Sequence, residues 1–260
     1  MTGLPMLHED SGDARARGKL PISETFLSVQ GEGKLTGVPS VFIRVSGCNL
    51  RCGWCDTPYA SWKPEGTRRS IASLIDEARA SPARHAVLTG GEPMLFEAIE
   101  DLSRGLRESG FHVTIETAGT IFRPPSALAC DLLSLSPKLA NSAPAIGDPR
   151  DPTGSWRARH EARRLPIETL RALIHAYAEH QLKFVVPAGE AELVPALVEI
   201  ERVLASIDAP VRASDVLLMA EGIAPAAPGA HEGVVRACVE RGWRYCRRVH
   251  VDLFGHKRGT

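Results

Sequence analysis

Residues 47–56 read GCNLRCGWCD, which places the thiols of Cys48, Cys52 and Cys55 within one short loop. Three thiolates at this spacing can bind three irons of a [4Fe–4S] cubane and leave the fourth iron open as a binding site. A zinc site and three buried thiols are the alternatives. Structural zinc usually takes four protein ligands at paired spacings, and no second Cys or His pair of that kind follows. A single distant residue could still complete a zinc site as its fourth ligand. The loop therefore favours an iron–sulfur cluster.

Strand and helix patterns alternate around this loop. Strands are predicted at 24–29, 41–45, 85–88, 112–116, 131–135, 182–186, 216–219 and 247–252. Helices are predicted after a Ser70 N-cap and at 96–108, 167–179, 192–205 and 233–241, the last followed by Gly242 as C′ residue. This order implies parallel βα units in an α/β fold, in which functional loops gather at the carboxyl ends of the strands.

The composition limits the partners and the compartment. The chain has 260 residues, with 31 basic against 31 acidic side chains, so neither a nucleic acid nor an anionic membrane is the expected main partner. Residues 1–20 lack the apolar run of a secretory signal and are expected to be a flexible extension before one domain, 21–260. Six cysteines are too few for a disulfide scaffold, which favours a reducing cytoplasm.

One segment breaks the alternation. Residues 141–165 carry prolines, Asp-Pro turns and a basic cluster but no helical or strand period. An irregular insertion is expected there, serving as a lid or as a dimer loop. The remaining cysteines match no ligand spacing and are expected to be buried, namely Cys130, Cys238 and Cys246.

With Trp54 just before its third cysteine, the loop resembles that of the radical S-adenosylmethionine (SAM) superfamily. The resemblance implies a partial, incomplete βα barrel in which SAM chelates the open iron and is cleaved to a 5′-deoxyadenosyl radical. The Thr89–Pro93 loop TGGEP follows a predicted strand, and its paired glycines allow close backbone approach to a ligand. The SAM contacts implied are Trp54, Cys55, Asp56, Gly91, Glu116, Ser136, Pro137, Lys138 and Glu221. Glu116 could instead be a solvated edge charge.

The segment FLSVQGEG at 26–33, the residues Asp56-Thr57 and the ending GHKRGT at 255–260 resemble the 7-carboxy-7-deazaguanine synthase family. The resemblance implies a lyase that contracts 6-carboxy-5,6,7,8-tetrahydropterin to 7-carboxy-7-deazaguanine with loss of ammonia. The implied substrate contacts are Val29, Gln30, Gly31, Glu32, Arg44, Thr89, His250 and Thr260. Gln30 offers amide donors and an acceptor to the pterin edge, and Arg44 offers a planar fork to its carboxylate.

The same resemblance implies a magnesium ion bound by the hydroxyl of Thr57, a homodimer, and an electron donor of the flavodoxin or ferredoxin type. Thr57 could instead only satisfy its own loop, and His250, expected on the last strand, could be a core residue. Two other functions stay open. A glycyl-radical-enzyme activating enzyme can use this cysteine spacing, whereas an iron–sulfur electron carrier needs four protein ligands. Whether the product enters queuosine in tRNA or a deazapurine natural product is not encoded in these motifs.

Overall fold

A computed structural model describes residues 18–260, and one nine-stranded sheet runs through them in the order β3-β1-β2-β4-β5-β6-β7-β8-β9. The strands are β1 (Lys19–Val29), β2 (Pro39–Val45), β3 (Thr67–Ser70), β4 (His85–Gly90), β5 (His112–Thr117), β6 (Leu132–Leu135), β7 (His180–Val186), β8 (Val216–Ala220) and β9 (Arg244–Tyr245). β1 is antiparallel to both its neighbours, and every other pair is parallel. Because β3 and β9 are separate edges, the sheet does not close, and the partial α/β barrel expected from the sequence is confirmed.

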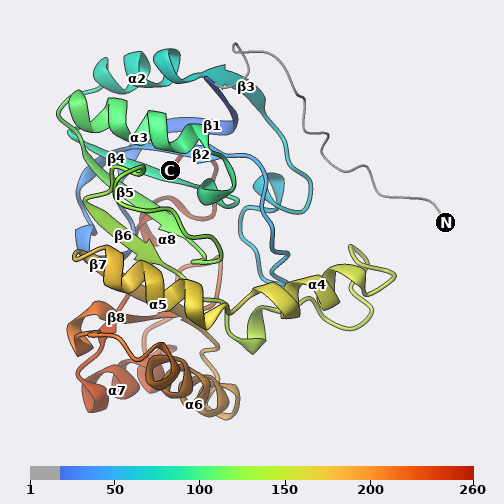
Figure 1. Ribbon diagram of the computed structural model, residues 1–260. Coiled ribbons are helices and arrows are strands. Elements are labelled where there is room, and N and C mark those ends of the chain that lie inside the picture. Colours follow the sequence, from blue (N-terminus) through green and yellow to red (C-terminus); the bar gives the residue numbers. More distant parts are fainter. Residues whose placement is uncertain (1–17) are drawn as a thin grey trace.

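Helices cover one face of this sheet (Figure 1). They are α2 (Ile71–Arg79), α3 (Ala98–Glu108), α5 (Ile167–Ala176), α6 (Glu190–Ile207) and α7 (Glu232–Arg241). Their buried faces share one core with alternate strand residues such as Ile43, Leu88, Ile115 and Phe184. No helix among residues 18–260 is long and apolar enough to span a membrane.

The residues between these core positions point to the opposite face, which we call the inner face. It carries Phe42 and Arg44 on β2, Thr89 on β4, Glu116 on β5 and Lys183 on β7. Side chains alternate between the two faces of a strand, so an apolar set packed on helices leaves the intervening polar set free to form a site. The alternation of these strands therefore builds the core and the site from the same segments.

Two helix ends behave as their residues predict. The Ser70 hydroxyl accepts a hydrogen bond from Ser73 N at 3.2 Å and caps α2. Gly242 follows α7 with φ of 67°, a left-handed conformation that glycine adopts without a Cβ clash.

Two predicted boundaries are wrong. Residues 247–252 are not a strand, because α8 (Val249–Phe254) occupies them and the last strand is the two-residue β9 before it. The expected N-terminal extension ends too late, since Lys19 and Leu20 belong to β1 and Leu20 is fully buried. Residues 1–17 of that extension lie outside the described residues.

The insertion is more regular than its sequence suggests. It contains α4 (Ser155–Arg163), which extends away from the sheet in Figure 1. The Asp151 carboxylate accepts hydrogen bonds from Trp156 N and Arg157 N and so satisfies the first turn of the helix. Only His160 of this helix is buried, and its ring contacts Ser142 Oγ at 2.9 Å. A helix without an apolar stripe gives no periodic signal in the sequence.

Candidate active site

A cavity of about 400 Å³ lies on the inner face, where the strands end. Strands β2, β4, β5 and β7 supply its floor, the cysteine loop supplies one wall, and residues 248–260 supply another. The antiparallel strand β1 brings residues 26–32 to the same cavity. Segments from both ends of the chain thus meet over the carboxyl ends of parallel strands, where α/β folds place their sites.

The three clustered cysteines all line this cavity. Burial raises the pKa of Cys48 and of Cys52 to about 12, so both are protonated thiols until a metal displaces their protons. Within residues 18–260, no three His, Cys, Asp or Glu side chains converge closely enough to hold one metal ion. A cubane binds each thiolate through a different iron and needs three separated sulfurs around one space, so the thiols fit such a cluster.

Side chains on both sides hold the cysteine loop in place. Trp62 Nε1 donates to Cys52 O at 2.9 Å, and the Arg51 guanidinium donates to Cys48 O at 2.7 Å. Backbone N–H of Leu50 contacts Cys48 Sγ at 3.4 Å, and Ser61 Oγ lies 3.1 Å from Cys55 Sγ. The loop is therefore shaped by the protein itself.

In the TGGEP loop, Gly91 allows the backbone to pack closely against the cysteine loop. An ideal Cβ on Gly91 would lie 2.0 Å from Gly47 O, and Glu92 N donates to the same carbonyl at 2.9 Å. The buried Glu92 carboxylate accepts from Met94 N and from Thr117 Oγ1, which ties this loop to the next strand end. Gly91 does line the cavity, but its close backbone neighbour is protein, whereas the sequence interpretation assigned that approach to a ligand.

Replacing Gly91 by alanine should therefore displace the cysteine loop. The new methyl group meets a backbone carbonyl, which cannot rotate away, so we expect a lower Tm and a several-fold loss of iron after anaerobic reconstitution. Gly233→Ala is the matched control, because Gly233 lies in α7 and its Cβ would make an ordinary 3.5 Å contact with Leu193 of α6, so both quantities should stay unchanged or the Tm should rise. Parental iron content in Gly91→Ala would contradict this role of the glycine.

Glu116 lies on the cavity floor and joins two neighbouring elements. Gln30 Nε2 donates to Glu116 Oε1 at 3.1 Å, and Thr89 Oγ1 donates to Glu116 Oε2 at 2.7 Å. Gln30 Oε1 also accepts from Glu32 N at 3.1 Å. The Gln30 side chain thus uses its acceptor and one donor within the protein, which leaves one amide hydrogen for a ligand, fewer groups than the sequence suggested.

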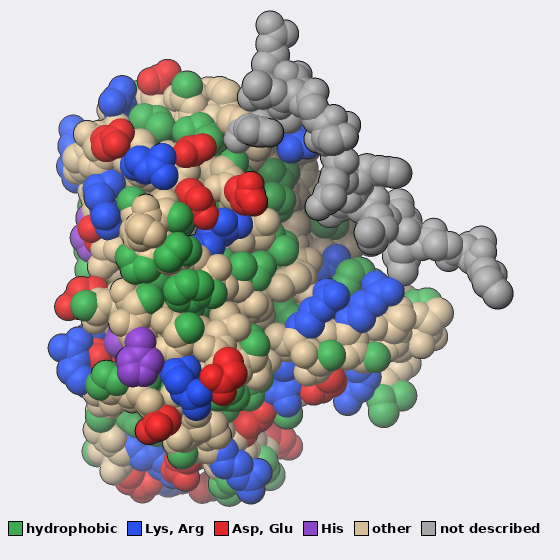
Figure 2. Space-filling view, viewed as in Figure 1, with side chains coloured by type: hydrophobic (Ala, Val, Ile, Leu, Met, Phe, Trp, Pro, Cys, Tyr) green, Lys and Arg blue, Asp and Glu red, His purple; other side chains and the backbone are tan. Residues whose placement is uncertain are grey.

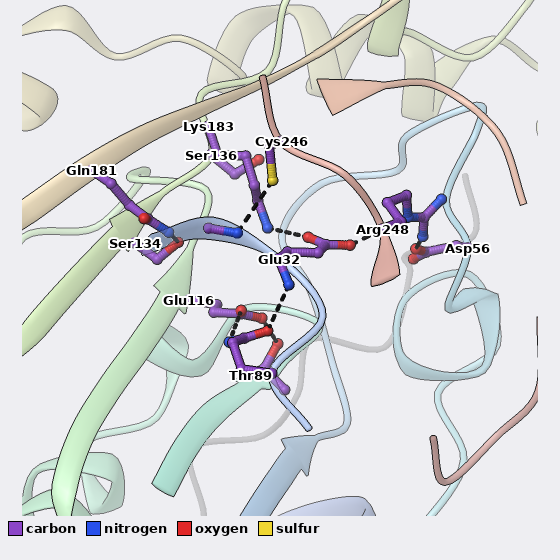
Figure 3. Close-up of polar contacts among 12 residues, drawn as sticks. Glu32, Asp56, Thr89, Glu116, Ser134, Ser136, Gln181, Lys183, Cys246 and Arg248 are labelled. Carbon is purple, nitrogen blue, oxygen red and sulfur yellow. Dashed lines mark hydrogen bonds and ion pairs between the residues drawn. The ribbon is translucent and has the colours of Figure 1, made fainter. Parts of the chain in front are cut away.

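Glu32 stands between two cations (Figure 3). Its carboxylate contacts Lys183 Nζ on one side and Arg248 Nε at 3.2 Å on the other, and Arg248 also contacts Asp56 of the cysteine loop. Burial alone would raise the pKa of Glu32, but Lys183 and Arg248 lower it to about 2. Burial would likewise lower the pKa of Lys183, and Glu32 more than offsets it. Glu32 and Lys183 are therefore both charged at neutral pH. Through Arg248, which contacts Asp56, Glu32 also links the substrate side of the cavity to the cysteine loop.

Arg44 is already oriented by a partner. Its Nε contacts Glu24 Oε1 at 2.6 Å, and Tyr59 Oη donates to the same oxygen at 2.8 Å. Burial would lower the pKa of Arg44, but Tyr59 and Glu24 raise it, so its charge is secure. Among residues 18–260, no carboxylate is paired with its two terminal nitrogens, which are the fork a ligand carboxylate would need.

The C-terminal segment closes the cavity. His250 lies in α8 and not on a strand, and an ideal Cβ on Gly31 would fall 2.0 Å from His250 Nδ1. Gly31 is thus needed for contact with α8. Arg258 stacks 3.5 Å above the centre of the Tyr59 ring, and His256 Nε2 lies 2.9 Å from Asp56 O. Thr260 also lines the cavity.

Most of the other residues that the resemblance implies as ligand contacts line the main cavity, and one lines a second cavity. Val29, Trp54, Thr57, Ser136 and Lys138 line the main one, where Lys138 Nζ donates to Ser136 Oγ at 2.7 Å and lies 5.4 Å from the Trp54 ring centre. Pro137 does not line it. Glu221 lines a neighbouring cavity of about 600 Å³.

Sequence reasoning missed several groups of the site. Arg248 was hidden by the mistaken strand at 247–252, and Glu92 was read only as part of a turn motif. Phe26 and Phe42, whose rings stack with centres 4.8 Å apart, add an apolar wall. The signal available for Phe26 was its position in the alternating strand before Gln30.

Comparison with known proteins agrees with this geometry. Residues 42–135 match the Radical SAM superfamily. A 7-carboxy-7-deazaguanine synthase of Rhodopirellula baltica is 48% identical over 262 residues, covering 99% of this chain and 96% of the relative. One of Halobacterium salinarum is 45% identical over 250 residues, covering 94% and 93%.

The fold has a solved counterpart. The crystal structure of QueE from Escherichia coli superposes with a TM-score of 0.59 at 24% identity, covering 92% of this chain and all of that one. That likeness confirms the architecture, and the near-complete sequence matches decide the family. The chain belongs to the 7-carboxy-7-deazaguanine synthase family within the radical SAM superfamily.

Proposed function

We propose that the chain converts 6-carboxy-5,6,7,8-tetrahydropterin to 7-carboxy-7-deazaguanine with release of ammonia, as a radical SAM lyase of 7-deazapurine and queuosine biosynthesis. The observation that carries the proposal is 48% identity to a named synthase over nearly the whole of both chains. The cavity supports this proposal, because the three thiols, Arg44 with its two terminal nitrogens free of any carboxylate among residues 18–260, and polar side chains of the strands line one space.

Cys48, Cys52 and Cys55 would hold the [4Fe–4S] cluster. When bound, the cluster would supply the electron for reductive cleavage of SAM, and with it the radical chemistry that the ring contraction needs. The chain's own groups bind and orient. Trp54 and Lys138 line the same cavity as the three thiols, where SAM would lie, and the Glu116 carboxylate is held on the floor by Gln30 and Thr89.

The pterin would lie between β1 and the C-terminal segment. The terminal nitrogens of Arg44 would take the pterin carboxylate, and Glu32 would remain a fixed anion between Lys183 and Arg248. Phe26 and Phe42 would contact the ring and exclude water from it. We also propose a homodimer, and a one-electron donor of the flavodoxin or ferredoxin type.

Thr57 is our proposed magnesium ligand. Its hydroxyl lies 3.8 Å from Cys55 Sγ, and Thr57 lines the cavity in which a substrate-bound ion would lie. One neutral oxygen is a thin ligand set, which magnesium tolerates because it keeps waters and shares substrate oxygens.

Thr57→Ala should lower pterin turnover by about 10–100-fold and remove its stimulation by Mg²⁺, with the cluster absorbance unchanged. Thr57→Ser keeps the oxygen and is the matched control, expected to retain Mg²⁺ stimulation. Steady-state assays across a Mg²⁺ titration measure both. Equal stimulation in Thr57→Ala and the parent enzyme would remove Thr57 from the metal site.

The decisive test of the function is anaerobic reconstitution with iron and sulfide, followed by incubation with SAM, dithionite and the carboxypterin. Product and ammonia should appear together, with the product identified by mass spectrometry. A glycyl-radical activating enzyme would instead need a partner protein, and the synthase identities over the full chain argue against it. Cleavage of SAM without conversion of the pterin would refute the proposal.

A further inference from the structure

The insertion at 141–164 lies directly against the cysteine loop. Gly53, between the second and third cysteines, donates its N–H to Ser142 O at 2.9 Å, and its carbonyl accepts from Arg150 at 2.8 Å. Arg51 N contacts His160 Nδ1 at 3.2 Å. The insertion therefore covers the loop that would hold the cluster, and none of residues 141–164 lines the cavity.

This cover carries unbalanced positive charge. Its three acidic groups are all in use: Asp148 pairs with Arg150, Asp151 caps α4, and Glu161 pairs with Arg164. Arg157, Arg159 and Arg163 have no carboxylate partner among residues 18–260. Arg163 is exposed, and Figure 2 shows Lys and Arg side chains gathered along the α4 projection.

An aromatic residue connects the charged surface to the loop. The Arg51 guanidinium lies 4.0 Å from the centre of the Trp156 ring, and the Arg159 guanidinium lies 5.1 Å from it. Arg150 stacks in the same way at 4.4 Å on Trp62, which donates to Cys52 O. These stacks hold the exposed Arg150 and the half-buried Arg159 in fixed positions near the cysteine loop.

We propose that this basic surface of α4 and Arg150 is the docking site of a small acidic one-electron carrier protein that reduces the cluster. The inference rests on the proposed function, in which each reductive cleavage of SAM takes one electron from the reduced cluster. One electron leaves the reduced carrier and enters the oxidised cluster, with no bond made or broken in this chain. An arginine surface attracts an acidic partner over several ångströms and aligns it for close approach to the cluster loop.

The test compares two reductants on the reconstituted full chain. Arg159→Glu/Arg163→Glu should raise the concentration of reduced flavodoxin needed for half-maximal pterin turnover by at least about tenfold. With dithionite, which needs no docking surface, turnover and cluster absorbance should match the parent. Arg163→Glu alone should give a smaller rise. Arg244→Glu, an exposed arginine of edge strand β9, is the matched control and should behave as the parent.

Salt provides a second readout. Raising NaCl from about 50 to 300 mM should slow the flavodoxin-driven reaction of the parent much more than that of the double variant, because salt screens the docking attraction that the double variant has already lost. Parental flavodoxin kinetics in the double variant would overturn the inference. So would an equal loss of turnover with dithionite. Failure of the parent with dithionite would refute the proposed function instead.

Discussion

Replacing Cys48, Cys52 or Cys55 by alanine is expected to abolish the brown cluster absorbance and all SAM cleavage. Each thiolate would hold a different iron, so the loss of one leaves two ligands and a cubane that the loop cannot retain. All three thiols line the same cavity, and no other cysteine among residues 18–260 lines it. Iron and sulfide content after anaerobic reconstitution, together with 5′-deoxyadenosine formation, measures the effect.

The other three cysteines are the internal controls. Cys238 is buried on α7, Cys130 is half-buried, and Cys246 packs against Val185 and Met219 behind the site. Each should accept alanine with the cluster intact. The ligand assignment would be wrong if Cys52→Ala kept its iron while Cys130→Ala lost it.

Arg44→Ala should lower kcat/KM for the carboxypterin by about 30-fold to several thousand-fold. A bidentate guanidinium–carboxylate pair in a partly dry site costs about 2–5 kcal/mol when one partner is removed. Arg44→Lys should rescue little, because an ammonium group cannot supply the two parallel donors. Cluster content and uncoupled SAM cleavage should persist, and these separate lost substrate binding from a collapsed loop.

Glu24→Gln is the companion variant, because it keeps the Arg44 charge and loosens only its orientation. We expect a loss of at most about tenfold in kcat/KM. Parental kcat/KM in Arg44→Ala would assign the substrate carboxylate elsewhere. Lys183 is already paired with Glu32, so the exposed Lys257 would become the first candidate.

Most of the fold could be predicted from local pattern. Dense apolar runs predict core strands such as β4 and β7. Cap residues predict the start of α2 and the end of α7. The pattern failed where an element depends on distant partners. α8 has an alternating Val-His-Val-Asp sequence, but Val249 N bonds to Gly31 O and the segment turns into a helix against β1.

The site was predictable residue by residue but not in its pairing. The cysteine spacing and the Thr-Gly-Gly-Glu-Pro motif identify chemistry that depends on local geometry. No local pattern shows that the Gln30 amide donates a hydrogen bond to Glu116, or that Gly47 O packs against Gly91 where a Cβ would clash. The first contact runs from the end of β1 to β5, with β2 and β4 between them in the sheet, and the second joins the loops after the neighbouring strands β2 and β4. Both therefore follow from topology.

The ion-pair network around Glu32 has a consequence for the order of folding. The cysteine ligands span eight positions of the sequence, and the farthest of the contacts described at Gly47, Arg51 and Gly53 joins Arg51 to His160 across 109 positions. Glu32 meets Arg248 across 216 positions, and such a contact forms only after the whole sheet has assembled. Iron capture and a competent substrate wall are thus separable events. A destabilised variant can therefore bind the brown iron–sulfur cluster and still be inactive. The cluster absorbance reports only on the cysteine loop and not on the substrate wall.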